Sequence, residues 1–245
     1  MSRDFAQYDT RHYQTLAVTE GYAAWSVVYD EQLDGKLAGN LDTSLLEQLT
    51  SVDWSSVATI VDLACGTGRI SAWLASRGAG KQAIDGVDLT REMLAVAKSK
   101  GIYRHLVCED LTATSLASAS ADLIVNSMAL CHVPALAAAY READRLLAPD
   151  GTFILIDYHP FFLLSGIPTH FRDRDGEQWA IHNSVHLFSD HFAAASEPGW
   201  RLVEMHERVV SDDWTESAPS WQKYVGKPVT FAMVWRKPAA RGGRP

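Results

Sequence analysis

The sequence predicts an α/β fold in which helices cover both faces of a mostly parallel sheet. Short apolar runs, which are typical of buried strands, alternate along the chain with apolar stripes at helical spacing. A glycine-rich turn at Gly66 and Gly68 joins the first apolar run to the first helical stripe. At 245 residues and 47% hydrophobic content, the chain can bury a substantial core as one domain.

The first half of the core is expected to contain three strands and two helices. The strands are predicted at residues 59–63, 83–87 and 103–108. The first helix carries Ile70 and Leu74 on its apolar face and ends at Gly78. Thr90 is a suitable N-cap for the second helix, which ends at Gly101.

The second half adds four strands, of which the last two differ from the rest. The strands are predicted at residues 122–126, 152–157, 200–206 and 229–235. Helices are expected at 134–147, where "APDG" ends the pattern, and near 189–195. A polar connection that contains tryptophan, rather than a helix, joins the last two strands, which favours an antiparallel pair.

Two segments lie outside this alternation. Residues 1–56 are predicted to form a helical cap, with Trp25 on its apolar stripe. Residues 158–192 form a long insertion, and loops of that length in a compact domain are usually lids or binding loops. The core therefore spans 57–238, and the tail at 239–245 is expected to be disordered.

Composition argues against a nucleic-acid or membrane partner. The net charge is -8, so that no overall field attracts the chain to polyanions or anionic lipid. Neither a signal peptide nor a run of about 20 apolar residues is found, and we expect a cytoplasmic protein. Cys65, Cys108 and Cys131 are far apart without CxxC spacing and are predicted to be reduced, mostly buried thiols.

The glycine turn predicts a ligand site. Gly66 and Gly68 allow a sharp turn and a close approach of a ligand to the backbone, and helix-start amides favour polar or anionic groups. The carboxyl end of a first strand is also where open α/β sheets bind ligands. A turn without a ligand is the alternative, because a GxG pair alone is a weak signal.

A dinucleotide site is the first competing interpretation. The G-x-G-x-x-G fingerprint would have a third glycine at position 71, where this chain has Ser71, although Asp88 falls at the expected distance for a ribose ligand. Two further acids, Asp62 before the glycines and Asp110 after the third strand, have no required role in a dinucleotide site. They favour a different nucleotide cofactor.

Five motifs in order resemble those of the class I (seven-strand, Rossmann-like) S-adenosylmethionine-dependent methyltransferases. They are "VDLACGTG", "GVDLT", "CEDL", "ADLIVNSMALCHV" and "RLLAPDGTFIL". The resemblance covers residues from about 57 to 157 and the order of the last two strands, with Ala64 where glycine is common. It implies a Rossmann-like three-layer sandwich, with a mostly parallel seven-stranded sheet and an antiparallel last strand.

The resemblance also implies roles for individual residues. The loop residues Asp62, Ala64, Gly66 and Gly68 would hold the methionine end of S-adenosylmethionine. Asp88 would bind both ribose hydroxyls and Leu89 would pack on the adenine, whose amino group Asp110 would receive with Leu111 beside the ring. Tyr13 and Tyr22, in the cap, are expected to cover the cofactor.

Methyl transfer requires an aligned acceptor and, for some acceptors, a base near neutral pKa. His159 follows the fifth strand and is predicted to be this base or an orienting group, a hydrogen bond within the lid being the alternative. His132 follows the fourth strand and is expected to contact substrate. A histidine at this place in "ALCHV" is common in the resembling family, so a structural or cofactor-side role is the alternative.

The insertion holds further histidines and aromatic side chains. His182 and His186 would share a face only if their segment were helical, and no glutamate completes a zinc motif, so we expect no metal. His170 is predicted to contact substrate. Trp25 and Phe161 are expected to wall an acceptor pocket, although aromatic stripes are more often core.

The sequence therefore predicts a cytoplasmic methyltransferase that acts on a small, aromatic or otherwise apolar metabolite, with a role in biosynthesis as a further expectation. "NSMALCHV" stands where amino-group enzymes of nucleic acids have Asn-Pro-Pro-aromatic or Asp-Pro-Pro-aromatic, which argues against a nucleic-acid substrate. A membrane partner is not expected, and a homodimer is an open option. The alternatives are an NAD(P)-dependent oxidoreductase and a non-catalytic S-adenosylmethionine-binding protein.

Overall fold

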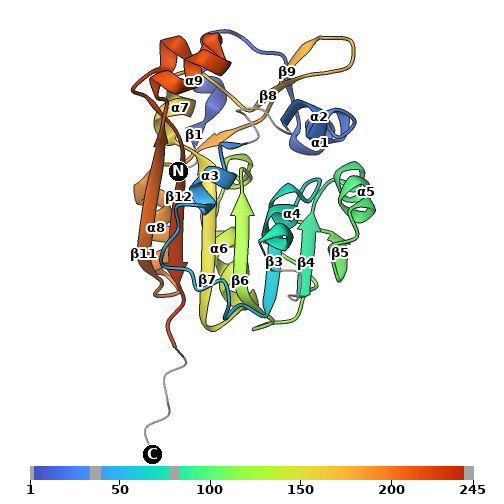
Figure 1. Ribbon diagram of the computed structural model, residues 1–245, viewed down its shortest axis with the longest axis vertical. Coiled ribbons are helices and arrows are strands. Elements are labelled where there is room, and N and C mark those ends of the chain that lie inside the picture. The colour runs from blue at the N-terminus through green and yellow to red at the C-terminus, as the bar shows by residue number, and fades with distance from the viewer. Residues whose placement is uncertain (1–2, 34–39, 78–82, 240–245) are drawn as a thin grey trace, which may run out of the picture.

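The computed structural model describes residues 3–33, 40–77 and 83–239. Its main sheet is built from β3 (Thr59–Leu63), β4 (Ala83–Asp88), β5 (His105–Cys108), β6 (Ala121–Ser127), β7 (Leu147–Tyr158), β11 (Arg201–Val209) and β12 (Pro228–Arg236). The strand order is β11-β12-β7-β6-β3-β4-β5 (Figure 1). Within this sheet β12 runs antiparallel to the other six strands, and the predicted α/β fold is confirmed.

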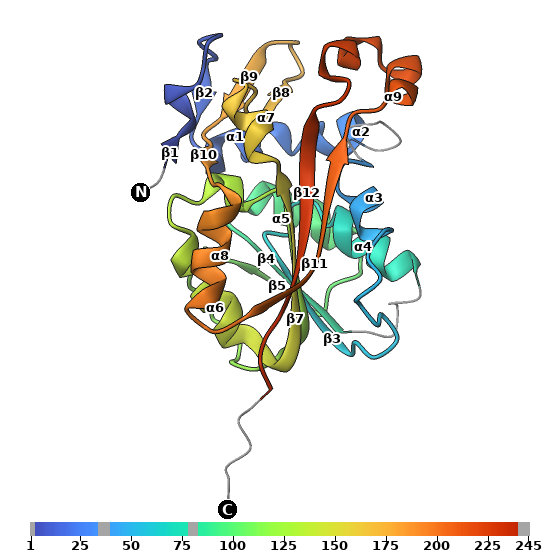
Figure 2. The same cartoon turned by 90° about the vertical axis from the view of Figure 1, so that its left-hand side faces the viewer.

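Helices cover both faces of this sheet (Figure 2). On one face lie α3 (Thr43–Leu46) and α4 (Arg69–Ser76), which bury Leu46 and Leu74 against the strands. On the other face lie α6 (Leu136–Leu146) and α8 (Phe188–Ser196), where Tyr140 packs against Trp200. Burial of these apolar stripes is the main source of stability of such a sandwich.

A second layer lies across the carboxyl edge of the sheet and is called the cap below (Figure 1). From the N-terminal segment it takes α1 (Val18–Trp25) and α2 (Tyr29–Leu33), and from the insertion α7 (Pro160–Leu164) and β8 (His170–Arg172). A bare Gly21 lets α1 approach the insertion, since a Cβ there would lie 2.7 Å from Ile181. The ring of Trp25 stacks on Phe171 at 5.2 Å.

The N-terminal segment is not wholly helical, so that part of the prediction is wrong. Its short strands β1 (Arg3–Asp4) and β2 (Thr15–Leu16) pair with β10 (Ser184–Val185) and β9 (Gln178–Ile181) of the insertion. Two-residue strands carry no periodic pattern of their own. Their conformation is set by partners that are far away in the sequence.

The connection between β11 and β12 also differs from the prediction. It contains α9 (Asp212–Ser217) and the 3-10 helix η5 (Pro219–Tyr224) instead of an irregular chain. Trp214 and Trp221 of this segment pack with Phe162 of α7. This tertiary contact favours a helical conformation that the polar sequence alone does not predict. The predicted antiparallel pairing of the two strands is confirmed.

Several smaller predictions from the sequence can also be compared with the structure. Gly101 has φ +66° and follows the end of α5 (Arg91–Ser99), as predicted. The predicted helix end at Gly78, and all but Ala239 of the predicted disordered tail, lie outside the described residues. All three cysteines are free, and Cys65 and Cys131 are buried. Within the described ranges, no helix has the length and apolar character that crossing a membrane requires.

Candidate functional site

The turn between β3 and α4 contains two glycines and has three residues in the left-handed region of backbone conformation. Ala64 has φ +70°, Gly66 +54° and Gly68 +85°. A Cβ at Gly66 would meet open space, so a ligand can approach this backbone closely. Gly68 is the N-cap of α4 and supplies no side-chain cap, an arrangement that suits a polar or anionic ligand at the start of the helix.

Ala64 is the one residue of these three that has a side chain, and its conformation is strained. We expect Ala64→Gly to raise the free energy of unfolding by about 1 kcal/mol, because glycine adopts φ +70° without the Cβ clash. The exposed Ala95 in the helix α5 is the matched control, and Ala95→Gly should lower stability by about 0.5–1 kcal/mol. Equilibrium urea denaturation measures both, and a loss of stability in Ala64→Gly would contradict the expectation.

Asp88 ends β4 and holds the glycine turn in place. Its two carboxylate oxygens accept hydrogen bonds from the backbone N–H groups of Gly66 and Thr90, both at 2.8 Å. Burial raises the pKa of Asp88, whereas these N–H donors favour the carboxylate. Because each oxygen can accept a second bond, Asp88 keeps acceptor capacity for a ligand. Thr90 occupies the predicted N-cap position, but its own side chain makes no capping bond.

Asp62 lies deeper, at the end of β3, and is only 1% exposed. Its Oδ2 accepts hydrogen bonds from the hydroxyls of Ser71, at 2.6 Å, and Tyr103, at 2.9 Å. Burial raises the pKa of Asp62 to about 6, and the two hydroxyls oppose that shift. Ser71 stands where the dinucleotide fingerprint has its third glycine, and here its side chain orients Asp62.

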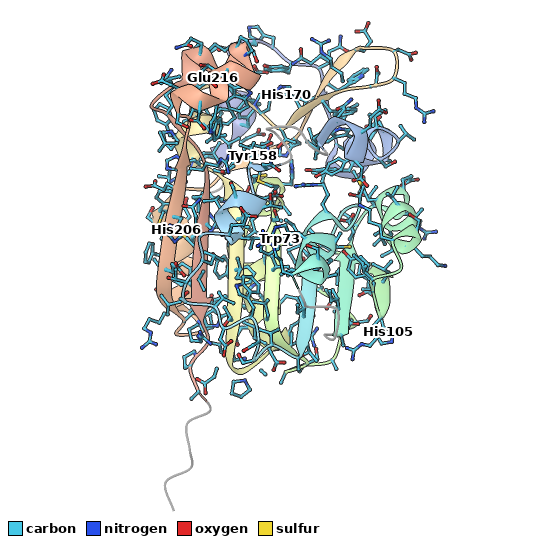
Figure 3. All side chains as sticks on the ribbon, in the orientation of Figure 1. Trp73, His105, Tyr158, His170, His206 and Glu216 are labelled. Carbon is cyan, nitrogen blue, oxygen red and sulfur yellow. The ribbon has the colours of Figure 1, made fainter. Side chains whose placement is uncertain are left out.

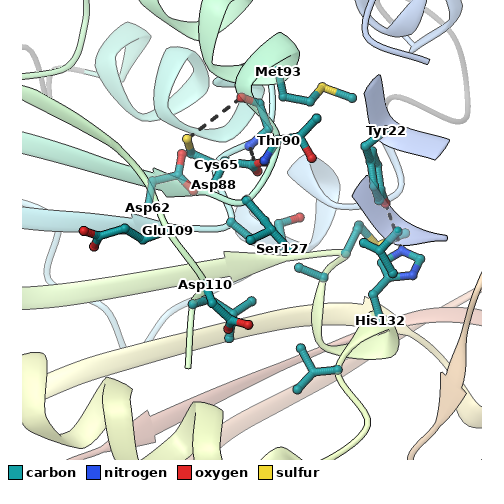
Figure 4. A pocket seen from close by; sticks show the side chains of 18 of the residues that line it. Tyr22, Asp62, Cys65, Asp88, Thr90, Met93, Glu109, Asp110, Ser127 and His132 are labelled. Carbon is teal, nitrogen blue, oxygen red and sulfur yellow. Dashed lines mark hydrogen bonds between the residues drawn. The ribbon is translucent and has the colours of Figure 1, made fainter. Parts of the chain in front are cut away.

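These groups line a cavity of about 430 Å³ between the sheet edge and the cap (Figure 4). The volume falls within the roughly 300–1,000 Å³ of small-molecule sites. Nine of the predicted site residues line it: Tyr22, Asp62, Ala64, Gly66, Asp88, Leu89, Asp110, Leu111 and His132. The cavity therefore brings together the ends of β3, β4 and β5, the turn after β6, and the cap.

One end of the cavity combines apolar and acidic side chains. Leu89 lines this end and is 46% exposed, so its side chain is accessible to a ligand. Asp110 accepts hydrogen bonds from the backbone N–H and the hydroxyl of Thr112, at 2.8 and 2.7 Å. Leu111 packs against the core beside it. Together they form an apolar wall with a carboxylate at its rim.

Tyr22 and His132 form a hydrogen-bonded pair on the opposite wall (Figure 4). The Nδ1 of His132 lies 2.6 Å from the carbonyl oxygen of His182, which can only accept, so this nitrogen carries the proton. The bare Nε2 of His132 then accepts from the Tyr22 hydroxyl at 2.9 Å. Burial lowers the pKa of His132 to about 4 and raises that of Tyr22 well above its usual value, so both are neutral near pH 7.

Sequence reasoning missed a buried ion pair in the same cavity. The Nη2 of Arg69 lies 2.6 Å from the Oδ2 of Asp42, which also accepts from the Ser127 hydroxyl at 3.1 Å. Tyr29 lies next to Arg69, and burial raises the pKa of Tyr29 to about 12. Arg69 directly follows the glycine turn, which marks it as a candidate. No local pattern marks Asp42, which comes 27 residues before Arg69.

His159 is not among the lining residues, although it follows β7 as predicted. Its Nδ1 accepts from the backbone N–H of Phe161 at 3.0 Å, so the proton is on Nε2, which donates to Glu207 at 2.7 Å. Both ring nitrogens are therefore engaged at the start of α7. Burial lowers the pKa of His159, and the contact with Glu207 opposes the shift.

Four other predicted residues and Gly68 lie outside the cavity lining. Tyr13 stacks on His170 of β8, which lies in the cap (Figure 3), with the ring centroids 6.0 Å apart. Trp25 is buried in the cap, and Phe161 is 45% exposed on α7. The structure therefore brings neither the Tyr13–His170 pair nor these two aromatic side chains to the cavity.

The histidines of the insertion have separate partners. His170 Nδ1 bonds to the carbonyl of Pro168, and His186 Nε2 to that of Val133. His182 Nε2 lies 3.5 Å from Asp4. Across the described part of the chain, no three His, Cys, Asp or Glu side chains gather as a metal site would require.

The chain matches a family described as "Methyltransferase domain" over residues 61–155. It is 34% identical over 125 residues, 47% of this chain and 42% of the relative, to a malonyl-[acyl-carrier protein] O-methyltransferase from Methylovorus. It is also 34% identical over 101 residues, 40% of this chain and 39% of the relative, to a ubiquinone/menaquinone biosynthesis C-methyltransferase from Rubrivivax gelatinosus. The chain thus spans less than half the length of these two relatives.

A solved S-adenosylmethionine-dependent methyltransferase from Mesorhizobium loti has the same fold. Its TM-score is 0.64 at 23% identity, over 84% of this chain and all of that one. The matched domain contains the glycine turn of β3, the acidic end of β4 and the strands up to Leu155. The domain match over residues 61–155 and the shared fold both support the class I (seven-strand, Rossmann-like) S-adenosylmethionine-dependent methyltransferase family.

Proposed function

We propose that this protein transfers a methyl group from S-adenosylmethionine to a small acceptor, which is aromatic or otherwise apolar. The observation that carries the proposal is that one cavity is lined both by Asp88 and Leu89, which suit a nucleoside, and by the Tyr22–His132 pair. One relative is named as a malonyl-[acyl-carrier protein] O-methyltransferase and the other as a ubiquinone/menaquinone biosynthesis C-methyltransferase, and the second name is a supporting analogy for a small apolar acceptor.

The side chains that line the cavity fit this cofactor. Asp88 has acceptor capacity for two vicinal ribose hydroxyls, and the exposed face of Leu89 offers an apolar surface to adenine. We assign Asp110, which lines the same end of the cavity, as the acceptor for the adenine amino group. Of the charged side chains among the described lining residues, five are carboxylates and one is a guanidinium, which favours a cationic ligand.

We assign the acceptor to the end of the cavity bounded by Tyr22, Tyr29 and His132. When bound, the cofactor supplies an electrophilic methyl group, so the protein has to orient the acceptor and exclude water. The Tyr22 hydroxyl proton is directed to His132 Nε2, which leaves the lone pairs of Tyr22 Oη free to accept from an O–H, N–H or acidic C–H of the acceptor. The two tyrosine rings suit a planar acceptor.

Calorimetric titration with S-adenosylmethionine, S-adenosylhomocysteine and NADH tests the proposal. Micromolar binding of the first two without NADH, followed by transfer of labelled methyl to a member of an acceptor library, is the expected result. Binding of NADH alone would support the oxidoreductase alternative. Tight binding of S-adenosylmethionine with no transfer to any acceptor would support a non-catalytic binding protein.

The affinity for S-adenosylmethionine should fall below about pH 6. The cationic groups of the cofactor favour the Asp62 carboxylate, whose pKa burial holds at about 6, so protonation of Asp62 competes with binding. We expect constant affinity from pH 8 to about 6.5 and a loss approaching tenfold per pH unit below 6. Asp62→Asn should remove this dependence, and calorimetry over the pH series measures both.

The stability of the free protein should respond to Asp62 with the opposite sign. The pKa of Asp62 in the folded protein, about 6, lies above its usual value of 3.8, so its contribution to stability is fully present below that lower value and is lost as pH rises through about 6. Loss of affinity on acidification would therefore not reflect unfolding through this group. An unchanged affinity at pH 5 would contradict contact between Asp62 and the cationic end of the cofactor.

A further inference from the structure

Asp30, on α2 of the cap, bridges two parts of the core. Its Oδ1 accepts a hydrogen bond from the hydroxyl of Thr67 at 2.6 Å, and its Oδ2 pairs with the Nζ of Lys100 at 2.7 Å. Thr67 belongs to the glycine turn, and Lys100 is the C-cap of α5. One carboxylate therefore joins the cap to both the turn and a core helix.

Thr67 is the member of the glycine turn best placed to transmit this contact. It stands between Gly66 and Gly68, which both have positive φ, and is itself only 1% exposed. The flanking glycines leave the turn with few side-chain contacts of its own. Removal of the Asp30 carboxylate with the cap in place would leave the Thr67 hydroxyl buried without this partner, which is costly for a polar group.

The ion pair with Lys100 is the weaker half of the bridge. The side chains of Lys100 and Asp30 are 24% and 26% exposed, so solvent screens their attraction. Lys100 also interacts favourably with the carboxyl end of its own helix. Its main effect is to hold Asp30 in the position from which it accepts from Thr67.

We propose that Asp30 is a positioning residue for the cofactor, which holds the cap on the glycine turn and thereby sets how long S-adenosylhomocysteine stays bound. This inference rests on the proposed function. Product leaves the cavity only after the Asp30–Thr67 hydrogen bond breaks and the cap separates from the turn. The residues act through the turn and the cap, without contact to the reacting atoms.

The dissociation rate of S-adenosylhomocysteine from the full chain tests the inference, by chase of labelled ligand with excess unlabelled ligand. Asp30→Ala and Thr67→Val should each raise this rate about tenfold, as expected for a hydrogen bond to a charged group. The double variant should also be about tenfold faster, because both changes remove the same bond. Asp30→Asn, which retains an acceptor oxygen, should be intermediate, and Lys100→Met should change the rate less than about threefold.

Arg3→Gln is the matched control. Arg3 pairs with Asp190 at 2.6 Å with similar exposure and also ties the N-terminal segment to a core helix, but neither residue lines the cavity. The dissociation rate of S-adenosylhomocysteine from Arg3→Gln should equal that from the wild type. Wild-type rates in Asp30→Ala and Thr67→Val, additive effects in the double variant, or equal acceleration in Arg3→Gln would each overturn the inference. Failure of the wild type to bind S-adenosylhomocysteine would overturn the proposed function as well.

Discussion

Asp88→Ala should weaken binding of S-adenosylmethionine and S-adenosylhomocysteine by about 10- to 100-fold, or about 1.5–3 kcal/mol. The carboxylate has two tasks in the structure. It accepts from the backbone N–H groups of Gly66 and Thr90, and it faces the cavity where the ribose is expected. Removal of the side chain therefore deprives the ligand of its acceptor and releases the turn that forms the floor of the site. Calorimetry with either ligand measures the loss.

Asp85 provides the control for this variant. It lies on the same strand but pairs with Arg104 and His105, at 2.6 and 3.0 Å, and does not line the cavity. Asp85→Asn should leave affinity unchanged. Asp88→Asn should be intermediate, because an amide retains one acceptor oxygen. Wild-type affinity in Asp88→Ala would remove Asp88 from the proposed site.

The parts of the site that sequence reasoning placed at the sheet edge share one property. Asp62, Asp88 and Asp110 each follow a short apolar run, and the carboxyl ends of neighbouring parallel strands meet at one edge. Their positions depend on local pattern and on sheet topology alone. This is why a single sequence was sufficient to predict the fold and these three acidic residues of the cavity.

The cap could not be predicted in the same way. Its pairing of β1 and β2 with β10 and β9 depends on register across some 165 to 180 residues of chain, and two-residue strands carry too little pattern to show it. Asp30 and Asp42 reach the core through contacts with residues 37 and 27 positions later in the sequence, which no local pattern indicates. His159 is the converse case, because its position after β7 was correct but Glu207 on β11 binds its side chain.

Tyr22→Phe should lower turnover by about 100-fold while leaving the affinity for S-adenosylmethionine near that of the wild type. We assign the Tyr22 oxygen as the hydrogen-bond acceptor that orients the substrate, and the bond from its hydroxyl to His132 Nε2 holds that oxygen in place. Loss of this alignment can cost about 100-fold in rate. His132→Ala should have a similar effect, and the double variant should be no slower than either single variant. The measurement is the initial rate of labelled methyl transfer to the acceptor found in the library.

Tyr140→Phe is the matched control, because the Tyr140 hydroxyl also bonds to a buried histidine, His191, at 3.0 Å but outside the cavity lining. It should turn over at the wild-type rate. His159→Ala shows whether Tyr22 or His159 is the group that acts on the acceptor. A loss of turnover in His159→Ala with none in Tyr22→Phe would return the catalytic role to His159, and would require Glu207 to release that side chain when the acceptor binds. The opposite result would make the cap, through Tyr22, part of the catalytic apparatus as well as its cover.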